Sequence, residues 1–98
     1  SFIQQKSIPV VLDNHDLIAL AKTGSGKTAA CAIPICHKVD TGSTNVQALI
    51  IVPTRELAMQ YAHETQKIGK YKGVKAFALC GGEDASLQLS KLKAGVQV

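Results

Sequence analysis

Residues 21–28, AKTGSGKT, constrain this chain more than any other stretch, because they have the form of a phosphate-binding loop in its usual context. The apolar run 17–21 leads into the loop, and the helix-prone run 29–33 follows it. A strand, a glycine-rich loop and a helix in this order bring backbone N–H groups and a helix N-terminus together on one anion. The stretch therefore predicts a site for a nucleoside polyphosphate.

The side chains of this loop suit the same ligand. Gly24 and Gly26 let the backbone approach a phosphate closely. Lys27 supplies a positive charge for the outer phosphates, and the Thr28 hydroxyl suits Mg²⁺. Ala21 stands where the general pattern has glycine, so a small residue is kept there. The alternative is a flexible surface loop that happens to hold one lysine, and the flanking strand and helix patterns argue against it.

The size and composition fit one globular domain or part of one. The chain has 98 residues, of which 46% are hydrophobic, and no run approaches the roughly 20 apolar residues that span a bilayer. The net charge of +4 suits phosphate-bearing partners, although a solvated surface gives the same value. The three cysteines lack Cys-x-x-Cys spacing, which favours reduced core thiols in a cytosolic or nuclear protein. The three histidines have no metal-ligand spacing.

Helical and apolar segments alternate along the chain. Helices are predicted over 2–12, bent or restarted at Pro9, and from Lys27 to about Val39, irregular at Pro34. Apolar runs are predicted as strands over 17–21, 48–52 and 74–79, with a fourth strand beginning at 96–98. This alternation predicts an α/β fold with a largely parallel sheet and helices on both faces.

Capping residues predict two further helices. Thr54 is expected to cap a helix that closes at Gly69, and Asp84 a short helix that runs to Leu92 and ends at Gly95. The longer helix would pack through one apolar stripe, formed by Leu57, Tyr61 and Ile68.

Three loops directly follow predicted strands: the phosphate loop, residues 53–55 and residues 81–82. In a parallel sheet such loops emerge at one edge, where ligands bind. Arg55 is the only arginine of the chain and begins a helix, where the helix dipole disfavours a cation. An external anion or a carboxylate partner is therefore expected, with Glu56 the nearest candidate.

The paired glycines 81–82 allow a close backbone approach to a ligand or simply form a turn. A basic cluster is interpreted as a solvated face: Lys70, Lys72 and Lys75.

Three motifs in order make the chain resemble the N-terminal RecA-like domain of DEAD-box ATP-dependent RNA helicases. Residues 1–4, SFIQ, resemble the end of the family's Q motif, and residues 21–28 match motif I. Residues 53–60, PTRELAMQ, match motif Ia, and residues 81–82 sit where the family has its GG element. The resemblance covers essentially the whole chain. It implies a RecA-like P-loop NTPase core, of which residues 1–98 are the N-terminal portion.

The resemblance also implies roles for individual residues. Gln4 would hydrogen-bond the adenine edge and favour ATP over GTP, since an amide both donates and accepts there. The phosphates of ATP would be held by Thr23, Gly24, Ser25, Gly26 and Lys27, and Mg²⁺ by Thr28. Lys27 and Thr28 are accordingly the catalytic candidates. The backbone of single-stranded RNA, contacted without reading its sequence, would meet Pro53, Thr54, Arg55, Gly81 and Gly82.

Other parts of the family pattern do not occur in these residues. No Asp-Glu-Ala-Asp follows an apolar run, and the pair Glu83-Asp84 is rejected as its equivalent because two glycines separate it from the strand end. The Ser-Ala-Thr element and the second RecA-like domain, the expected partner within a parent chain, are also lacking. The isolated chain is therefore expected to bind nucleotide weakly at most, and neither to hydrolyse ATP nor to unwind RNA.

Two other functions stay open. One is a different P-loop ATPase, such as a DNA helicase or translocase, and the other is a truncated, non-catalytic RNA-binding module or scaffold. The family's sheet places further strands between the runs 17–21 and 48–52. Those edges would be apolar and unpaired here, which predicts either a longer natural chain or a dimer that covers the gap. No membrane association is expected.

Overall fold

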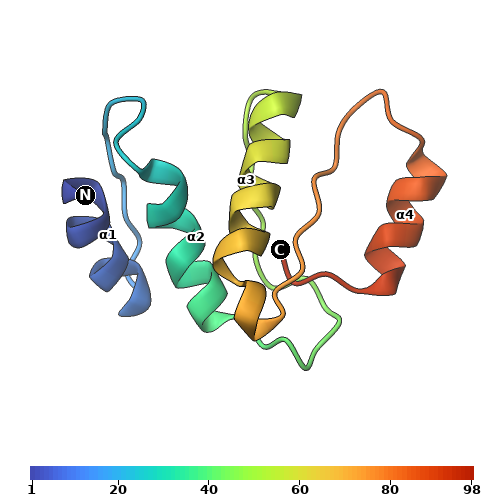
Figure 1. Cartoon of the computed structure of the whole chain (residues 1–98), viewed down its shortest axis with the longest axis horizontal. Helices are drawn as coiled ribbons and strands as arrows, with labels where there is room; N and C mark the ends of the chain where they lie inside the picture. The colour runs from blue at the N-terminus through green and yellow to red at the C-terminus, as the bar shows by residue number, and fades with distance from the viewer.

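The computed structural model describes all 98 residues, which form helices joined by irregular segments within 40 × 30 × 23 Å. The elements are α1 (Phe2–Leu12), α2 (Lys27–Lys38), α3 (Arg55–Ile68), the short 3₁₀ helix η1 (Lys70–Lys72) and α4 (Ala85–Ala94). Figure 1 shows the four α-helices in a row in chain order. The four helices expected from the sequence are thus confirmed, with α4 reaching Ala94 instead of Leu92.

Local chemistry explains where the helices begin. The Thr54 hydroxyl accepts a hydrogen bond from Leu57 N at 3.2 Å, and the Asp84 carboxylate accepts from Ser86 N at 2.8 Å. These bonds satisfy N–H groups that have no partner within the helix. Pro9 and Pro34 lie inside helices that continue through them, so α1 does not restart at Pro9. A proline removes one N–H donor, and at Pro34 full burial of the ring compensates for that loss.

The core lies where α2 and α3 meet. In the row of helices, α1 packs on α2 and α2 packs on α3. Buried Cys36, Val39 and Val74 form the centre of the core, and partly buried apolar side chains surround it: Ile35, Ile68 and Val98. Thr65 of α3 is fully buried on the same side of the helix as the predicted stripe, whose members are half-buried. Close packing therefore holds three helices together without a sheet.

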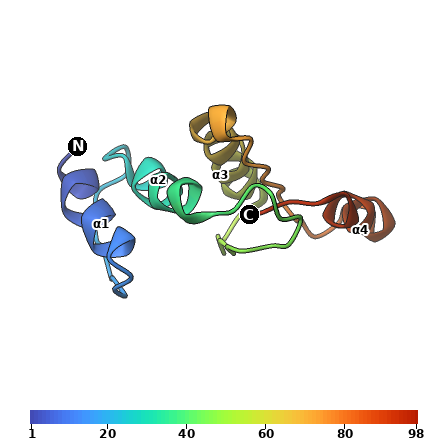
Figure 2. The same cartoon turned by 90° about the horizontal axis from the view of Figure 1, so that it is seen from below.

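The expected parallel sheet is not formed, which corrects the fold predicted for the apolar runs. None of the runs 17–21, 48–52, 74–79 and 96–98 forms a β-strand, and they appear as plain tubes outside the helices in Figures 1 and 2. A strand exists only when its N–H and C=O groups pair with a neighbour. Residues 17–21 and 49–52 make no backbone–backbone hydrogen bond, so no ladder develops.

Backbone bonds do join the run 96–98 to two others. The N–H of Gln97 donates to the Lys75 carbonyl at 3.0 Å, and the Gln97 carbonyl accepts from residues 47–48 at 2.8 and 3.1 Å. The buried Gln97 side chain adds 2.8 Å bonds to Lys75 N and the Ser43 carbonyl. The run 96–98 is therefore held between the other two.

Several large apolar side chains are left in solvent by this arrangement. Ile18 and Leu20 are each 92% exposed, and Leu49 and Ile51 are 78% and 85% exposed. They belong to the runs that lack backbone partners, as the sequence led us to expect for unpaired edges. None of the helices is both long enough and apolar enough to cross a membrane.

Candidate functional site

The phosphate loop is a tight turn directly before α2. Ser25 N donates to the Lys22 carbonyl at 3.2 Å, and the Ser25 hydroxyl donates to the same oxygen. Gly24 and Gly26 have φ of +82° and +92°, in the left-handed region that favours glycine. A Cβ on Gly26 would also lie 2.5 Å from Nε2 of Gln4. The backbone angle therefore favours glycine at both positions, and the space around the loop requires it at Gly26.

Backbone donors without a protein acceptor face outward at the start of α2. Its N-cap is Gly26, which has no side chain to cap the helix, and the N–H groups of residues 27–29 donate to no protein atom. Free N–H groups and the helix dipole together favour an anion at this position. The loop and the helix start therefore provide the geometry that a bound phosphate needs.

The side chains at this helix start are also free to bind a ligand. Lys27 is exposed, Thr28 is half-buried, and neither side chain makes an ion pair or hydrogen bond. Mg²⁺ bound to a nucleotide keeps several waters and phosphate oxygens, and the free Thr28 hydroxyl is available as one protein ligand beside them. No group of three or more His, Cys, Asp or Glu side chains that could hold a metal ion comes together in the chain.

Gln4 connects α1 to the phosphate loop. Its Oε1 accepts from the Ser1 backbone nitrogen at 3.2 Å, and its Nε2 donates to the Gly26 carbonyl at 3.3 Å. An amide has two N–H donors and two acceptor lone pairs, so Gln4 keeps one of each for a further partner. The residue predicted to read adenine is thus held directly beside the predicted phosphate site.

Arg55 is paired with the loop after the third apolar run. Its Nη1 lies 2.6 Å from Glu83 Oε1, and its Nη2 donates to the Gly81 carbonyl at 2.7 Å. The expectation that Glu56 is the carboxylate partner is wrong. Adjacent residues of a helix point in different directions, whereas Glu83 and the Gly81 carbonyl both lie within reach of the Arg55 guanidinium. This contact joins two segments that the sequence singled out separately.

The loop over residues 81–84 is fixed at several points. Gly82 has φ of +82°, and a Cβ there would lie 3.2 Å from Arg55 Nη2. The Gln88 Oε1 of α4 accepts from Cys80 N at 2.8 Å, and Asp84 caps the same helix. The loop is therefore held against both α3 and α4.

The predicted site residues form two groups along one edge of the molecule. In Figure 1 the phosphate loop, the start of α3 and the loop before α4 all lie along the upper edge. The first group consists of Gln4 and residues 23–28. The second group is exposed and consists of Pro53, Thr54, Arg55, Gly81 and Gly82. No hydrogen bond or ion pair joins the two groups.

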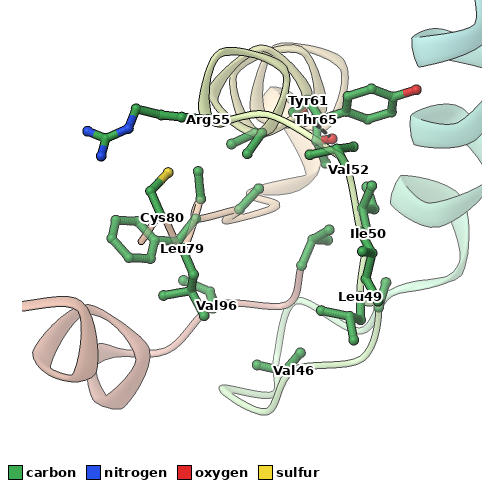
Figure 3. Close-up of a pocket in the computed structure, with 18 of the residues that line it drawn as sticks. Val46, Leu49, Ile50, Val52, Arg55, Tyr61, Thr65, Leu79, Cys80 and Val96 are labelled. Atoms are coloured by element: carbon green, nitrogen blue, oxygen red, sulfur yellow. Dashed lines mark hydrogen bonds between the residues drawn. The ribbon is translucent and has the colours of Figure 1, made fainter. Parts of the chain in front are cut away.

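One cavity borders the second group, because Pro53, Thr54, Arg55 and Gly81 are among the residues that line it. It has a volume of about 550 Å³ and is lined mainly by the runs 46–54 and 76–81 and by the inner side of α3. Figure 3 shows apolar side chains such as Leu49 and Val96 around it, while Arg55 points away. Most of its lining residues are apolar, so it is an unfilled part of the core and offers few of the donors that a phosphate needs.

One lysine of the predicted solvated face has a structural contact. Lys72 Nζ donates to the carbonyls of Cys36 and His37 at 2.9 and 2.8 Å, at the C-terminal end of α2. Burial raises the pKa of the Cys36 thiol, and the positive charge of Lys72 opposes that rise. Burial likewise raises the pKa of Cys31. All three cysteines are free thiols, and only Cys36 is buried, while Cys31 and Cys80 are half-buried.

Sequence reasoning missed the residues that position these groups. Glu83 was considered only as a catalytic carboxylate, and Gln88 was not singled out at all. Gln88 follows the capping residue Asp84 by four positions, so the two lie on the same side of the helix start. That spacing was the available signal. For Glu83 no local signal existed, because its partner lies 28 residues away in the sequence.

Comparisons with known proteins agree with these features. The family model described as DEAD/DEAH box helicase matches residues 1–98. The ATP-dependent RNA helicase CshA of Listeria monocytogenes is 51% identical over 96 residues, covering 98% of this chain and 18% of the relative. The DEAD-box ATP-dependent RNA helicase CshA of Geobacillus kaustophilus is 50% identical over 91 residues, covering 93% of this chain and 20% of the relative. The chain thus spans about a fifth of the length of these curated relatives.

Solved structures give the same result for the path of the chain. A DEAD box protein from Methanococcus jannaschii matches with a TM-score of 0.83 and 38% identity, over 98% of this chain and 26% of that one. The RNA helicase Prp28 from Chaetomium thermophilum, bound to ADP, matches with a TM-score of 0.81 and 36% identity, over 97% of this chain and 24% of that one. The helices and the runs between them therefore follow the path of a DEAD-box RecA-like domain, although the strand pairing of a sheet is absent.

Proposed function

The chain belongs to the DEAD/DEAH box helicase family, and from this premise we propose that residues 1–98 bind ATP and single-stranded RNA within an ATP-dependent RNA helicase. They would form the N-terminal portion of its first RecA-like domain. The observation that carries the proposal is the row of free N–H groups at the start of α2, directly after the turn with two left-handed glycines.

ATP would bind with its phosphates in this turn. Residues 23–27 would surround the phosphates through their N–H groups, and the Lys27 ammonium would stabilise charge on the outer ones. Thr28 would provide a ligand to Mg²⁺, which supplies charge neutralisation when bound. Gln4 would bind the adenine edge with its remaining donor and acceptor while its bond to Gly26 keeps it oriented.

RNA would bind along the exposed group at the start of α3. The Arg55 guanidinium suits a phosphate oxygen, and the exposed backbone of residues 53–54 and 81–82 allows a close approach. Contacts of this kind position a strand without reading its bases. The proposal therefore includes binding of RNA irrespective of its sequence.

Hydrolysis would require groups that these residues do not contain. The carboxylates that organise Mg²⁺ and water, and arginines directed at the γ-phosphate by a second RecA-like domain, would come from elsewhere in a longer protein. ATP binding and hydrolysis would then be coupled to closure of the two domains on RNA. Residues 1–98 alone are proposed to be inactive in ATP hydrolysis and unwinding.

The nucleotide half of the proposal is tested by titrating the protein with Mg-ADP in a calorimeter. Lys27→Ala should abolish binding, and Gln4→Ala should weaken it and reduce the preference for adenine over guanine nucleotides. Lys22→Ala is the matched control, because it removes an exposed lysine of the same loop that has no proposed ligand. Circular dichroism verifies folding of each variant. Unchanged affinity in folded Lys27→Ala would contradict the proposed site.

The RNA half is tested with labelled single-stranded oligonucleotides of the same sequence in RNA and DNA form. We expect tighter binding of RNA than of DNA, and weaker RNA binding by Arg55→Ala with ADP affinity unchanged. Equal binding of the RNA and DNA oligonucleotides would favour the alternative function, a DNA helicase or another P-loop ATPase.

A further inference from the structure

The single guanidinium proposed to contact RNA is already occupied within the protein. Arg55 Nη1 lies 2.6 Å from the Glu83 carboxylate, and Nη2 lies 2.7 Å from the Gly81 carbonyl oxygen. Arg55 is also the only arginine among the eleven basic residues of the chain. The best phosphate-binding group of this face is therefore neutralised by a neighbouring carboxylate.

We propose that the Glu83 carboxylate competes with RNA phosphates for Arg55. It would thereby lower both the affinity for RNA and the dependence of that affinity on salt concentration. The inference rests on the proposed contact between Arg55 and RNA. A carboxylate and a phosphate both present oxygens that match the planar donors of a guanidinium. An RNA phosphate that reaches Arg55 must therefore displace Glu83 or accept its negative charge close by.

The geometry makes this competition reversible. The side chains of Arg55 and Glu83 are 45% and 52% exposed, so water screens the pair and a stronger ligand can replace it. The adjacent acid, Asp84, is engaged elsewhere, because its carboxylate accepts from the N–H groups of Ser86 and Leu87. Glu83 is thus the one carboxylate that forms an ion pair with Arg55.

The opposite role, in which Glu83 prepares Arg55 for RNA, is disfavoured by the second contact. The Gly81 carbonyl holds Nη2 independently of the carboxylate, and Gly82 lies directly against the same nitrogen. The guanidinium therefore keeps its place over the glycine loop when the charge of Glu83 is removed. Removal of the Glu83 charge therefore changes the net positive charge that Arg55 presents to an RNA phosphate.

The test is RNA binding by Glu83→Gln, measured by fluorescence anisotropy with a labelled oligouridine at several salt concentrations. Glutamine keeps the size and an acceptor for Nη1 but removes the charge. When Arg55 becomes available to one RNA phosphate, the slope of log binding constant against log salt concentration becomes steeper by about 0.7. This slope corresponds to an affinity up to about fivefold higher at about 0.1 M salt. Glu64→Gln on α3 is the control, because it changes the net charge of the protein by the same amount but lies at a residue that forms no ion pair with Arg55.

Three results decide the matter. Tighter binding and a steeper slope in Glu83→Gln, absent in Glu64→Gln and lost in Arg55→Ala/Glu83→Gln, would support the competition. Equal or weaker binding by Glu83→Gln, with Arg55→Ala weakened, would overturn the competition and leave the RNA face intact. No effect of Arg55→Ala would overturn the RNA face itself and the inference with it. Glu83→Ser, which also lacks the charge, replaces Glu83→Gln if circular dichroism shows that variant to be misfolded.

Discussion

The Nε2 of Gln4 donates to the Gly26 carbonyl at 3.3 Å, so a side chain of α1 holds the backbone of the phosphate loop just before α2 begins. Gly26 itself is in the left-handed region, and a Cβ there would lie 2.5 Å from Gln4 Nε2 and 3.0 Å from Ser1 Oγ. The position of the loop therefore depends on α1 as well as on its own glycines.

Gly26→Ala should cost more stability and more nucleotide affinity than Gly24→Ala. Both positions have positive φ, which disfavours alanine by about 1–2 kcal/mol. Only at Gly26 does the new Cβ also meet another side chain, at 2.5 Å from Gln4 Nε2, whereas Gly24 faces open space. Urea unfolding and Mg-ADP calorimetry on both variants measure the difference. Equal losses would mean that the contact with Gln4 has no energetic role.

Gln88→Ala should weaken RNA binding without changing ADP affinity. The substitution removes the acceptor of the Cys80 N–H, at 2.8 Å, and so releases the glycine loop from α4. If Gln88 only positions the glycine loop, the affinity for RNA should fall several-fold, which is less than the loss caused by Arg55→Ala. Anisotropy with oligouridine and calorimetry with Mg-ADP provide the two measurements. Gln66→Ala on α3, which removes an exposed glutamine without a hydrogen bond, serves as the control.

Gly69→Ala should destabilise the protein by about 1–3 kcal/mol through overpacking. Gly69 has φ of −89°, so the backbone tolerates alanine, but a Cβ would lie 2.5 Å from Val74 Cβ in the buried core. Gly81→Ala is the control: its Cβ meets no atom within 4 Å, and its stability should change by under about 0.5 kcal/mol. The free energy of unfolding in urea measures both. A neutral Gly69→Ala would show that the core relaxes around the new methyl group.

Ile18→Thr/Leu20→Thr should reduce self-association while helix content stays the same. Both side chains are 92% exposed in a run without backbone partners, which is the type of edge that pairs with another chain. Sedimentation equilibrium over a range of protein concentrations measures the association. If the wild-type protein remains monomeric throughout, the expectation that a dimer covers these edges is wrong.

Stability should fall as the pH rises above 9, the ordinary pKa of the cysteine thiols. Burial raises the pKa values of Cys31 and Cys36 in the folded state above the ordinary value of 9.0. Between 9 and the raised values the unfolded chain loses thiol protons that the folded chain keeps, so the free energy of unfolding decreases. Urea unfolding from neutral to alkaline pH should show a smaller decrease for Cys31→Ala/Cys36→Ala. An identical decrease in that variant would assign the effect to other groups.

Much of the local structure was predictable because it depends on neighbouring residues. The helix starts follow from Thr54 and Asp84, and the helix end from Gly69, each through contacts within a few positions. The phosphate loop was equally readable, since the spacing of Gly24, Gly26 and Lys27 is itself the signal. The sheet was not formed, because strands need partners and the apolar pattern of a run does not supply them.

The sequence by itself determined the family, the helices and the residues suited to bind phosphates, because these follow from motif spacing, capping and side-chain chemistry. Tertiary structure alone decided that Glu83 and not Glu56 pairs with Arg55, that Gln4 holds the Gly26 carbonyl, and that Lys72 caps α2. These contacts join segments 22 to 36 residues apart. Only the packing of the helices and the path of the loops between them bring such residues within hydrogen-bonding distance.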